Sequence, residues 1–305
     1  PAYRNAVVIM CLIFACLLAL TQGYRGGRMA GNRNRTTFSD ILVFSQGCVS
    51  ILFVFLVGIF VAGLGLSTDA QCYAVIRICI VMYGAAKVLL YLFLLERVYI
   101  VRAPFVERSR DPIYLVAAIP TIGGFSALIG YELIAPIAEL SREDGVCRIG
   151  IRPPAAISVM VLDTAINVIL TGVFIWQLWP AITSISSRTS HFMQNAGRKR
   201  NLKGIIGKLF HKRDTSSLER QSTRGHLRKM LIRNVAGSSL LLLCTIANNV
   251  IFLQFSFAKM AHACLLMCLT DVVLGMLITN WLTLRSVEEE ASSRRPSCPT
   301  PYNSN

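Results

Sequence analysis

Residues 41–66 read ILVFSQGCVSILFVFLVGIFVAGLGL, an apolar run that contains no charged side chain. A helix needs about 20 apolar residues to cross the ~30 Å hydrocarbon core of a bilayer, and this run exceeds that length. In lipid, each backbone N–H and C=O group needs a partner within its own segment, so the run must be helical. Of all 305 residues, 54% are hydrophobic and 15% are charged, whereas about 25% are charged in a soluble domain. The sequence therefore predicts an integral membrane protein.

Similar apolar runs recur along the chain and predict an all-α fold, a bundle of seven transmembrane helices. The expected helices span residues 6–22, 41–66, 73–101, 113–137, 155–182, 234–255 and 260–284. They form one transmembrane domain, residues 1–285, with a basic loop at 184–230 and a tail at 286–305 whose composition is typical of disorder. The first run is the shortest. The alternative for it is a cleaved signal peptide, which would leave six helices.

The distribution of positive charge orients the bundle. With the N-terminus outside, five of the 31 lysines and arginines lie on the external side and 24 on the cytoplasmic side, with Arg77 and Lys87 within the membrane. Because cytoplasmic loops are enriched in lysine and arginine, this asymmetry predicts an external N-terminus and a cytoplasmic C-terminus, most simply at the plasma membrane. The formal net charge of +15 then belongs to one membrane face and does not indicate nucleic-acid binding.

Four ionisable residues fall inside the expected helices: Arg77, Lys87, Asp163 and Asp271. A charge at membrane depth costs at least a few kcal/mol, so such groups pair with one another or line a wet cavity. The depths of the four residues allow two pairs across helices, Lys87 with Asp271 and Arg77 with Asp163, and the opposite pairing remains open. Either pairing makes these residues candidates for an intramembrane polar network.

Polar residues at helical spacing extend this network. They share a face within each of two expected helices, and they are Asp163, Asn167 and Thr171 in the fifth helix and Thr245, Asn248 and Asn249 in the sixth. Such stripes point into a bundle, either as contacts that hold the helices together or as the floor of a ligand pocket.

Two cysteines, Cys72 and Cys147, fall in the external layer, and Cys264 lies slightly deeper at the start of the last helix. The external side is oxidising, which favours a disulfide between Cys72 and Cys147. The alternative is two free thiols that never meet.

The run LERVYIVR at residues 95–102 closes the third expected helix. An acid–arginine pair followed by an aromatic residue at this place resembles the signature of rhodopsin-like G-protein-coupled receptors, and the placement of Cys72 and Cys147 recurs in seven-helix receptors. The resemblance implies a signalling switch, in which Arg97 is held at rest by Glu96 or Asp40 and meets a G protein when released. The alternative is an interfacial ion pair that marks the membrane edge, where arginine reaches water readily.

Other motifs differ from that receptor class. The sixth expected helix has no proline, and the seventh has no Asn-Pro-x-x-Tyr sequence. The runs KVLLYLFLLERVYIVR at 87–102, CRIG at 147–150 and DTAINV at 163–168, together with Asp271, resemble a fungal group of predicted seven-helix membrane proteins. That group is receptor-like in layout, and the resemblance brings no ligand with it.

The basic loop contains RKRNLKGIIGKLFHKR at residues 198–213, where apolar residues recur at helical spacing among lysines. We expect Lys203, Lys208, Phe210 and Lys212 to contact the lipid surface, with the apolar stripe in the interface and the cations on anionic lipid. The alternatives are a calmodulin-type or G-protein contact and a solvated loop.

Catalytic and cofactor motifs are missing from the sequence. The four histidines are scattered without metal-ligand spacing, no glycine-rich phosphate loop occurs, and no nucleophile has a base beside it. The last helix carries no lysine for a retinal Schiff base, because Lys259 precedes it and the next basic residue is Arg285. We therefore expect no enzyme, no metal and no cofactor.

Two functions remain. The first is a receptor that senses an external small-molecule or peptide ligand and signals to a cytoplasmic partner such as a heterotrimeric G protein. The second is a secondary transporter or proton-coupled carrier that uses Arg77, Lys87, Asp163 and Asp271 as its pathway. The chain shows no internal repeat of the kind common in transporters, and one long basic loop suits a receptor better.

Overall fold

The computed structural model describes residues 2–31, 37–64, 68–102, 112–134, 136–140, 147–150, 157–173, 175–176, 232–251 and 261–293. The predicted lipid-surface contacts of Lys203, Lys208, Phe210 and Lys212 lie outside these residues, as does most of the basic loop and the end of the tail.

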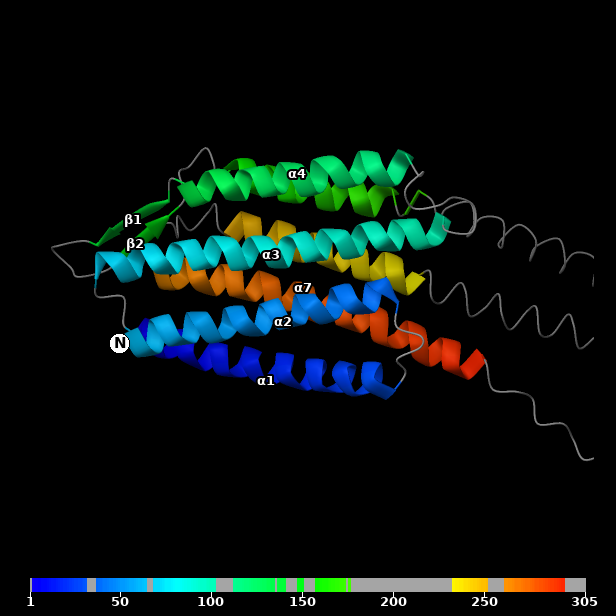
Figure 1. The fold of residues 1–305 in the computed structure, drawn as a ribbon, viewed down its shortest axis with the longest axis horizontal. Coiled ribbons are helices and arrows are strands. Elements are labelled where there is room, and N and C mark those ends of the chain that lie inside the picture. The colour runs from blue at the N-terminus through cyan, green and yellow to red at the C-terminus, as the bar shows by residue number, and fades with distance from the viewer. Residues whose placement is uncertain are drawn as a thin grey trace, which may run out of the picture.

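The described chain is a bundle of elongated helices (Figure 1). Five of them are α1 (Ala2–Gly31), α2 (Phe38–Gly58), α3 (Asp69–Arg102), α4 (Pro112–Ile134) and α7 (Ala261–Ser293), and a π-helical segment, η2 (Ile59–Leu64), continues α2. Two more helices are Ile157–Val173 and Ile232–Ile251, written below as helix 157–173 and helix 232–251. Within the described residues, six helices are long and apolar enough to cross a membrane, and helix 157–173 is apolar but shorter. The predicted helical bundle is confirmed, and its helices are consistent with an integral membrane protein.

Several helix ends differ from the predicted ones; α1 and α3, for example, begin at Ala2 and Asp69, earlier than the predicted residues 6 and 73. Helix α1 continues to Gly31 although its apolar run ends near residue 22, and α7 continues to Ser293 although the tail was expected from 286. Both extensions are polar, and a helix that has left the hydrocarbon needs no apolar side chains to keep its internal hydrogen bonds. Helix α4 ends at Ile134, whereas the sequence predicted a helix up to residue 137. Ile137 is therefore not helical.

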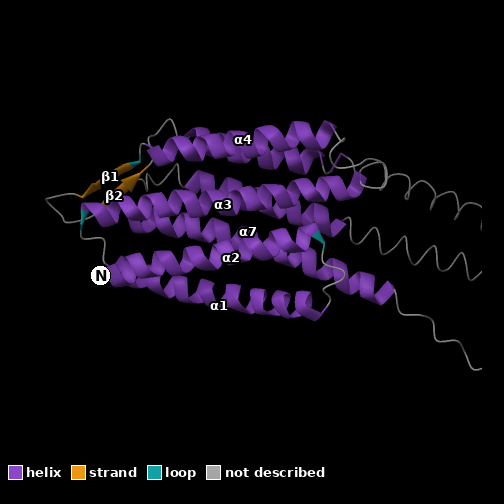
Figure 2. Cartoon of the chain, viewed as in Figure 1, coloured by secondary structure: helices purple, strands orange, loops and turns teal. Residues whose placement is uncertain are grey.

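Ile137 instead begins a short antiparallel hairpin, the non-helical addition to the expected all-α fold (Figure 2). Strand β1 (Ile137–Leu140) pairs with β2 (Cys147–Gly150) so that Leu140 faces Cys147. Cys147 forms a disulfide with Cys72 in the first turns of α3, with 5.9 Å between their Cα atoms, so the predicted cysteine pair is confirmed. We call this end of the bundle, where the N-terminus also lies (Figure 1), the hairpin end, and the opposite end the far end.

Helix α3 is the central element, since it contacts α2, α4, α7 and both strands. Helices α1, α2 and α7 contact one another beside it. Helix α2 approaches its neighbours closely at Gly47, where a Cβ atom would lie 2.7 Å from Cε of Met276 and would overlap the side chain of Gln22. The absent side chain of Gly47 therefore allows α1, α2 and α7 to pack together.

Candidate functional site

The side chain of Lys87 joins three helices in the interior of the bundle. Its Nζ atom lies 3.0 Å from Oδ2 of Asp163 on helix 157–173 and 2.7 Å from Oδ2 of Asp271 on α7. The three side chains are 3%, 1% and 5% exposed, respectively. A single ammonium group on α3 is therefore shared by two buried carboxylates from two other helices.

Two tyrosines of α3 complete this arrangement. The hydroxyl of Tyr83 donates to Oδ2 of Asp271 at 3.0 Å, and the hydroxyl of Tyr91 donates to Oδ1 of Asp163. Tyr83, Lys87 and Tyr91 are spaced by four residues and so share one face of α3. We call Tyr83, Lys87, Tyr91, Asp163 and Asp271 the acid–lysine centre. The tyrosines were missed from the sequence, although their spacing around Lys87 was visible there.

The polar stripe of helix 157–173 supports the same centre. Asn167 donates from Nδ2 to both Oδ1 and the backbone oxygen of Asp163, each at 3.0 Å, and is itself buried. Next to Asp163 in sequence, Thr164 accepts a hydrogen bond of 3.0 Å from Nδ2 of Asn249 on helix 232–251. These contacts fix the position of the Asp163 carboxylate and link a fourth helix to the network.

The charges in the acid–lysine centre do not balance, because one ammonium group faces two carboxylates. A buried ion pair with hydrogen-bonded partners is tolerated in an apolar interior, whereas removal of one partner costs about 3–5 kcal/mol. The tyrosine hydroxyls and the Asn167 amide spread the surplus negative charge over further donors. The centre is a polar lock between α3, α7 and helix 157–173.

Arg77 does not belong to this centre. It is exposed on α3, and it forms none of the ion pairs found among the described residues. The expected ion pair between Lys87 and Asp271 is present. Asp163 pairs with Lys87 as well, and not with Arg77 as expected. Arg77 and Lys87 are ten residues apart, which places them on different faces of α3 at 100° per residue.

A cavity of about 90 Å³ adjoins the acid–lysine centre. It lies between α3, α4, α7, helix 157–173 and helix 232–251, and its polar lining comes from Tyr83, Glu132, Asn248 and Asn249. Apolar side chains and three cysteines provide the rest of the wall. The cavity is smaller than the ~150 Å³ that admits benzene in an engineered apolar core, so it suits a small ligand or a few waters.

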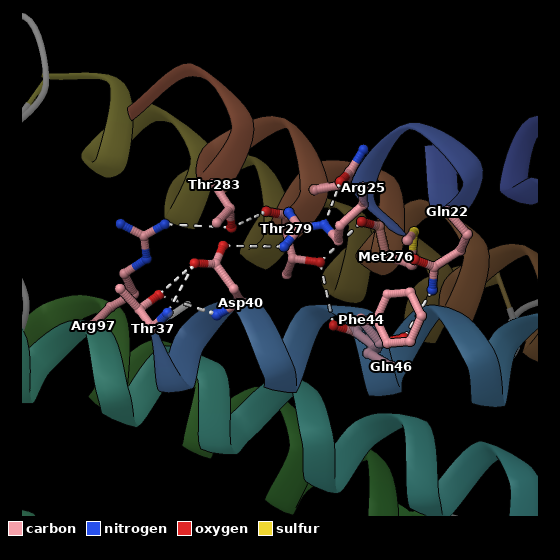
Figure 3. Close-up of polar contacts among 11 residues, drawn as sticks. Gln22, Arg25, Thr37, Asp40, Phe44, Gln46, Arg97, Met276, Thr279 and Thr283 are labelled. Carbon is pink, nitrogen blue, oxygen red and sulfur yellow. Dashed lines mark hydrogen bonds and ion pairs between the residues drawn. The ribbon is translucent and has the colours of Figure 1, made fainter. Parts of the chain in front are cut away.

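At the far end, arginines from three helices contact the second half of α7. Two of them, Arg25 and Arg97, are shown in Figure 3. Arg25 on α1 donates from Nε to Oδ1 of Asn280 at 3.0 Å, and its Nη1 lies 3.4 Å from Oδ1 of Asp40 on α2. Arg97 on α3 donates from Nη2 to Oγ1 of Thr283 at 3.5 Å, with its guanidinium 5.0 Å from the centre of the Phe93 ring. Arg233 on helix 232–251 donates from Nη2 to the backbone oxygen of Leu282 at 3.0 Å. We call Arg25, Asp40, Arg97 and Arg233 the arginine cluster.

Asp40 forms its ion pair with Arg25 and acts on Arg97 only at longer range, so the predicted hold of Asp40 on Arg97 stays a prediction. The carboxylate of Asp40 also accepts hydrogen bonds from the backbone N–H and the hydroxyl of Thr37, at 3.2 and 2.7 Å, in a capping box at the start of α2. Arg25 reaches Asp40 because α1 stays helical beyond its apolar run. Glu96, the other expected partner of Arg97, is buried at the far end of α3.

Helix α7 links the two polar centres. Asp271 belongs to the acid–lysine centre, and Asn280 and Thr283 contact the arginine cluster. Between them, Thr279 donates from Oγ1 to Oε1 of Gln46 on α2 at 3.2 Å. A rotation or shift of α7 at Asp271 would therefore move polar contacts along its whole length.

No protein-family model matches this chain, and no curated protein sequence matches it. The likeness of residues 87–102, 147–150 and 163–168 to a fungal seven-helix group stays a prediction.

Proposed function

We propose that this chain is a receptor-like membrane protein in which a small ligand in the cavity changes the packing of α3 against α7. One observation carries this proposal: the ring of Tyr83 lines the cavity, and its hydroxyl donates to Asp271 of the acid–lysine centre. A ligand that displaces the ring of Tyr83 acts directly on the lock that joins three helices.

The consequence of such a displacement reaches the far end through two rigid helices. Helix α3 carries Tyr83, Lys87 and Arg97, and helix α7 carries Asp271, Asn280 and Thr283. Loosening of the contact between Lys87 and Asp271 allows α7 to shift, and Thr283 then leaves Arg97. In this proposal Arg97 becomes available to a partner, as the resemblance of residues 95–102 to rhodopsin-like receptors implies.

The orientation in this proposal places the hairpin end outside the cell and the far end in the cytoplasm of a plasma-membrane protein. The excess of lysine and arginine in the segments that follow α1, α3 and helix 157–173 supports it. The disulfide at the hairpin end supports it as well, because disulfides persist on the oxidising side. The proposed partner is a heterotrimeric G protein, and the proposed relatives are the fungal seven-helix group.

The test uses membranes that contain the full chain together with a panel of G-protein heterotrimers, and it measures nucleotide exchange. Lys87→Met breaks the lock and is expected to raise exchange without any ligand. Arg97→Ala added to Lys87→Met is expected to remove that increase. Arg77→Met is the matched control, since it removes a cation from an exposed face of the same helix. Exchange that stays at background for every heterotrimer with Lys87→Met contradicts the proposal.

A proton-coupled carrier is the second candidate, and the charge imbalance of the acid–lysine centre favours it. Two carboxylates that share one ammonium group hold a surplus negative charge that a proton can neutralise. In proteoliposomes, this function requires a proton flux that Asp271→Asn abolishes and Arg77→Gln leaves unchanged. Such a flux, together with background nucleotide exchange, would replace the receptor proposal.

A further inference from the structure

The arginine cluster has more positive charge than its described partners neutralise. Arg25 is attracted by Asp40 and repelled by Arg28, which lies one turn beyond it on α1. Arg97 is repelled by Arg233 and Arg25 and attracted by Asp40. Among the side chains that the structure describes in and beside the cluster, the charged groups are the guanidinium groups of Arg25, Arg28, Arg97 and Arg233 and the carboxylates of Asp40 and Glu96. Like charges this close inside a bundle repel one another unless an anion is shared between them.

Two of these guanidinium groups also have donors to spare. Nη2 of Arg25 and Nε of Arg97 are buried and have no hydrogen-bond partner among the described residues. Arg25 as a whole is 2% exposed, so bulk solvent does not reach these donors freely. A buried donor without an acceptor costs free energy, more so when it is charged. In Figure 3, Asp40 lies between the side chains of Arg25 and Arg97, and its charge acts on both.

The contact between Arg25 and Asp40 is a weak one that an anion can replace. At 3.4 Å it is longer than the ~2.7–2.9 Å of a charge-assisted hydrogen bond. The Asp40 side chain is 19% exposed and Arg97 is half-buried, so the cluster opens to the surroundings on the side of these two residues. Asp40 keeps its bonds to Thr37 when Arg25 leaves it.

From this geometry we propose that the arginine cluster binds a phosphate monoester, with Arg97 and Arg25 as its donors and Asp40 as the group that it displaces. Three oxygens and a charge near −2 suit two planar guanidinium groups with free N–H donors better than a single carboxylate does. Arg25 and Arg97 lie near the far ends of the candidate spans Arg4–Gly31 and Asp69–Ile100. In the proposed orientation, these ends face the headgroups of the cytoplasmic leaflet. Phosphorylated headgroups of anionic lipids and soluble polyphosphates share this chemistry. The proposal goes beyond the proposed function and does not depend on a G-protein partner.

The experiment measures binding to the purified full chain in lipid nanodiscs. Three kinds of nanodisc are compared: phosphatidylcholine alone, phosphatidylcholine with phosphatidylserine, and phosphatidylcholine with a small fraction of phosphatidylinositol bisphosphate. In a fourth sample, soluble inositol trisphosphate is added to the nanodiscs of phosphatidylcholine alone. Bound lipid is counted by native mass spectrometry, and the thermal unfolding midpoint is recorded in parallel. The expected result is a rise in midpoint and a bound lipid with the bisphosphate only. An equal effect of the soluble trisphosphate also supports the site and identifies the free phosphate as its source.

Two variants move the affinity in opposite directions, which a purely structural role would not do. Arg97→Gln removes a charge-assisted hydrogen bond and is expected to weaken phosphate binding about tenfold or more. Asp40→Asn keeps the shape and the acceptor for Thr37 but removes the competing charge, so it is expected to tighten binding several-fold. Arg77→Gln, on the same helix as Arg97, is expected to leave binding unchanged.

The proposal is overturned if the bisphosphate lipid has no more effect than phosphatidylserine. It is also overturned if Arg97→Gln binds as the unmodified chain does, or if Asp40→Asn weakens binding. If Arg97→Gln does not fold, Asp40→Asn alone tests the proposal. It is expected to raise the affinity for phosphate, whereas a damaged fold would lower it.

Discussion

The Nζ atom of Lys87 lies 2.7 Å from Oδ2 of Asp271, closer than it lies to Asp163 at 3.0 Å. The two residues come from α3 and α7, which are adjacent in the bundle and far apart in the sequence. Their contact places a charged group from the central helix against the helix that also reaches the arginine cluster. Together with the hydrogen bond from Tyr83 to the same carboxylate, this ion pair joins α3 to α7 at the acid–lysine centre.

Lys87→Met is expected to lower the free energy of unfolding by about 3–5 kcal/mol, because it leaves two carboxylates buried without a cation. Methionine has a similar length but no charge, so it fills the space of Lys87 without pairing with Asp163 or Asp271. The measurement is the thermal unfolding of the purified chain in detergent, followed by the fluorescence of a thiol-reactive dye on the buried cysteines.

The control for this prediction is a second substitution at the same centre. Asp271→Asn added to Lys87→Met removes one of the two stranded charges and is expected to recover part of the loss. Arg77→Met, on an exposed face of α3, is expected to change stability by no more than about 0.5 kcal/mol. A double variant that is less stable than Lys87→Met alone would contradict the view that charge, and not packing, dominates this site.

The sequence predicts most of the membrane fold because lipid leaves few choices. Apolar runs of sufficient length must be helices, and the central parts of α2, α3 and α7 lie where the runs predict. The pair Cys72 and Cys147 could be predicted as well, since the charge asymmetry places both at one membrane face. The apolar runs do not predict where a helix ends once it extends beyond the hydrocarbon. For this reason the sequence did not predict the extension of α1 to Gly31.

The candidate site could be predicted only in part. The spacing of residues shows which of them lie on the same face of a helix, but it does not show which other helix that face contacts. Lys87, Asp163 and Asp271 were recognisable as costly intramembrane charges. Their assembly around one ammonium group depends on how α3, α7 and helix 157–173 are rotated against one another, which the spacing of residues does not specify. The same reason explains why the sequence did not predict the ion pair of Asp40 with Arg25.

Tyr91→Phe is expected to destabilise the fold by about 1.5–3 kcal/mol, because it removes a hydrogen bond to the buried Asp163 carboxylate. The ring of Tyr91 still packs edge-on against Phe125, with 5.2 Å between their centres, so the aromatic contact is retained. The matched control is Tyr24→Phe on α1, where the side chain is 56% exposed. Thermal unfolding of both variants measures the difference, and equal midpoints would show that the hydroxyl of Tyr91 contributes nothing.

Gly47→Ala is expected to destabilise the chain by about 1–3 kcal/mol, because the added methyl group meets Met276 and overlaps the side chain of Gln22. Gln22→Ala in the same chain makes room for the methyl group and is expected to restore part of the stability. The control is Gly27→Ala on α1, where nothing lies within 4 Å of the added atom. That substitution is expected to be neutral or to stabilise the helix by up to ~1 kcal/mol.

Replacement of Cys72 and Cys147 by serine is expected to cost about 4 kcal/mol, since the disulfide closes a loop with a sequence separation of 75 in the unfolded chain. Cys16→Ser is the control, because Cys16 is a free and exposed thiol. Unfolding midpoints with and without a reducing agent measure the effect. A reducing agent that lowers the midpoint of the Cys72→Ser/Cys147→Ser chain as much as that of the unmodified chain would assign the loss to another thiol.

Arg25 has two described partners at the far end, and double-mutant cycles are expected to rank them. The contact with Asn280 is 3.0 Å long and buried, so the cycle of Arg25→Met and Asn280→Ala is expected to give a coupling of about 1.5–3 kcal/mol. The contact with Asp40 is 3.4 Å long and partly exposed, so the cycle of Arg25→Met and Asp40→Asn is expected to give less than about 1 kcal/mol. Thermal unfolding of the unmodified chain and its five variants in phosphatidylcholine nanodiscs supplies both values. The reverse ranking would mean that Asp40 holds Arg25 firmly, and an incoming phosphate could then not displace it.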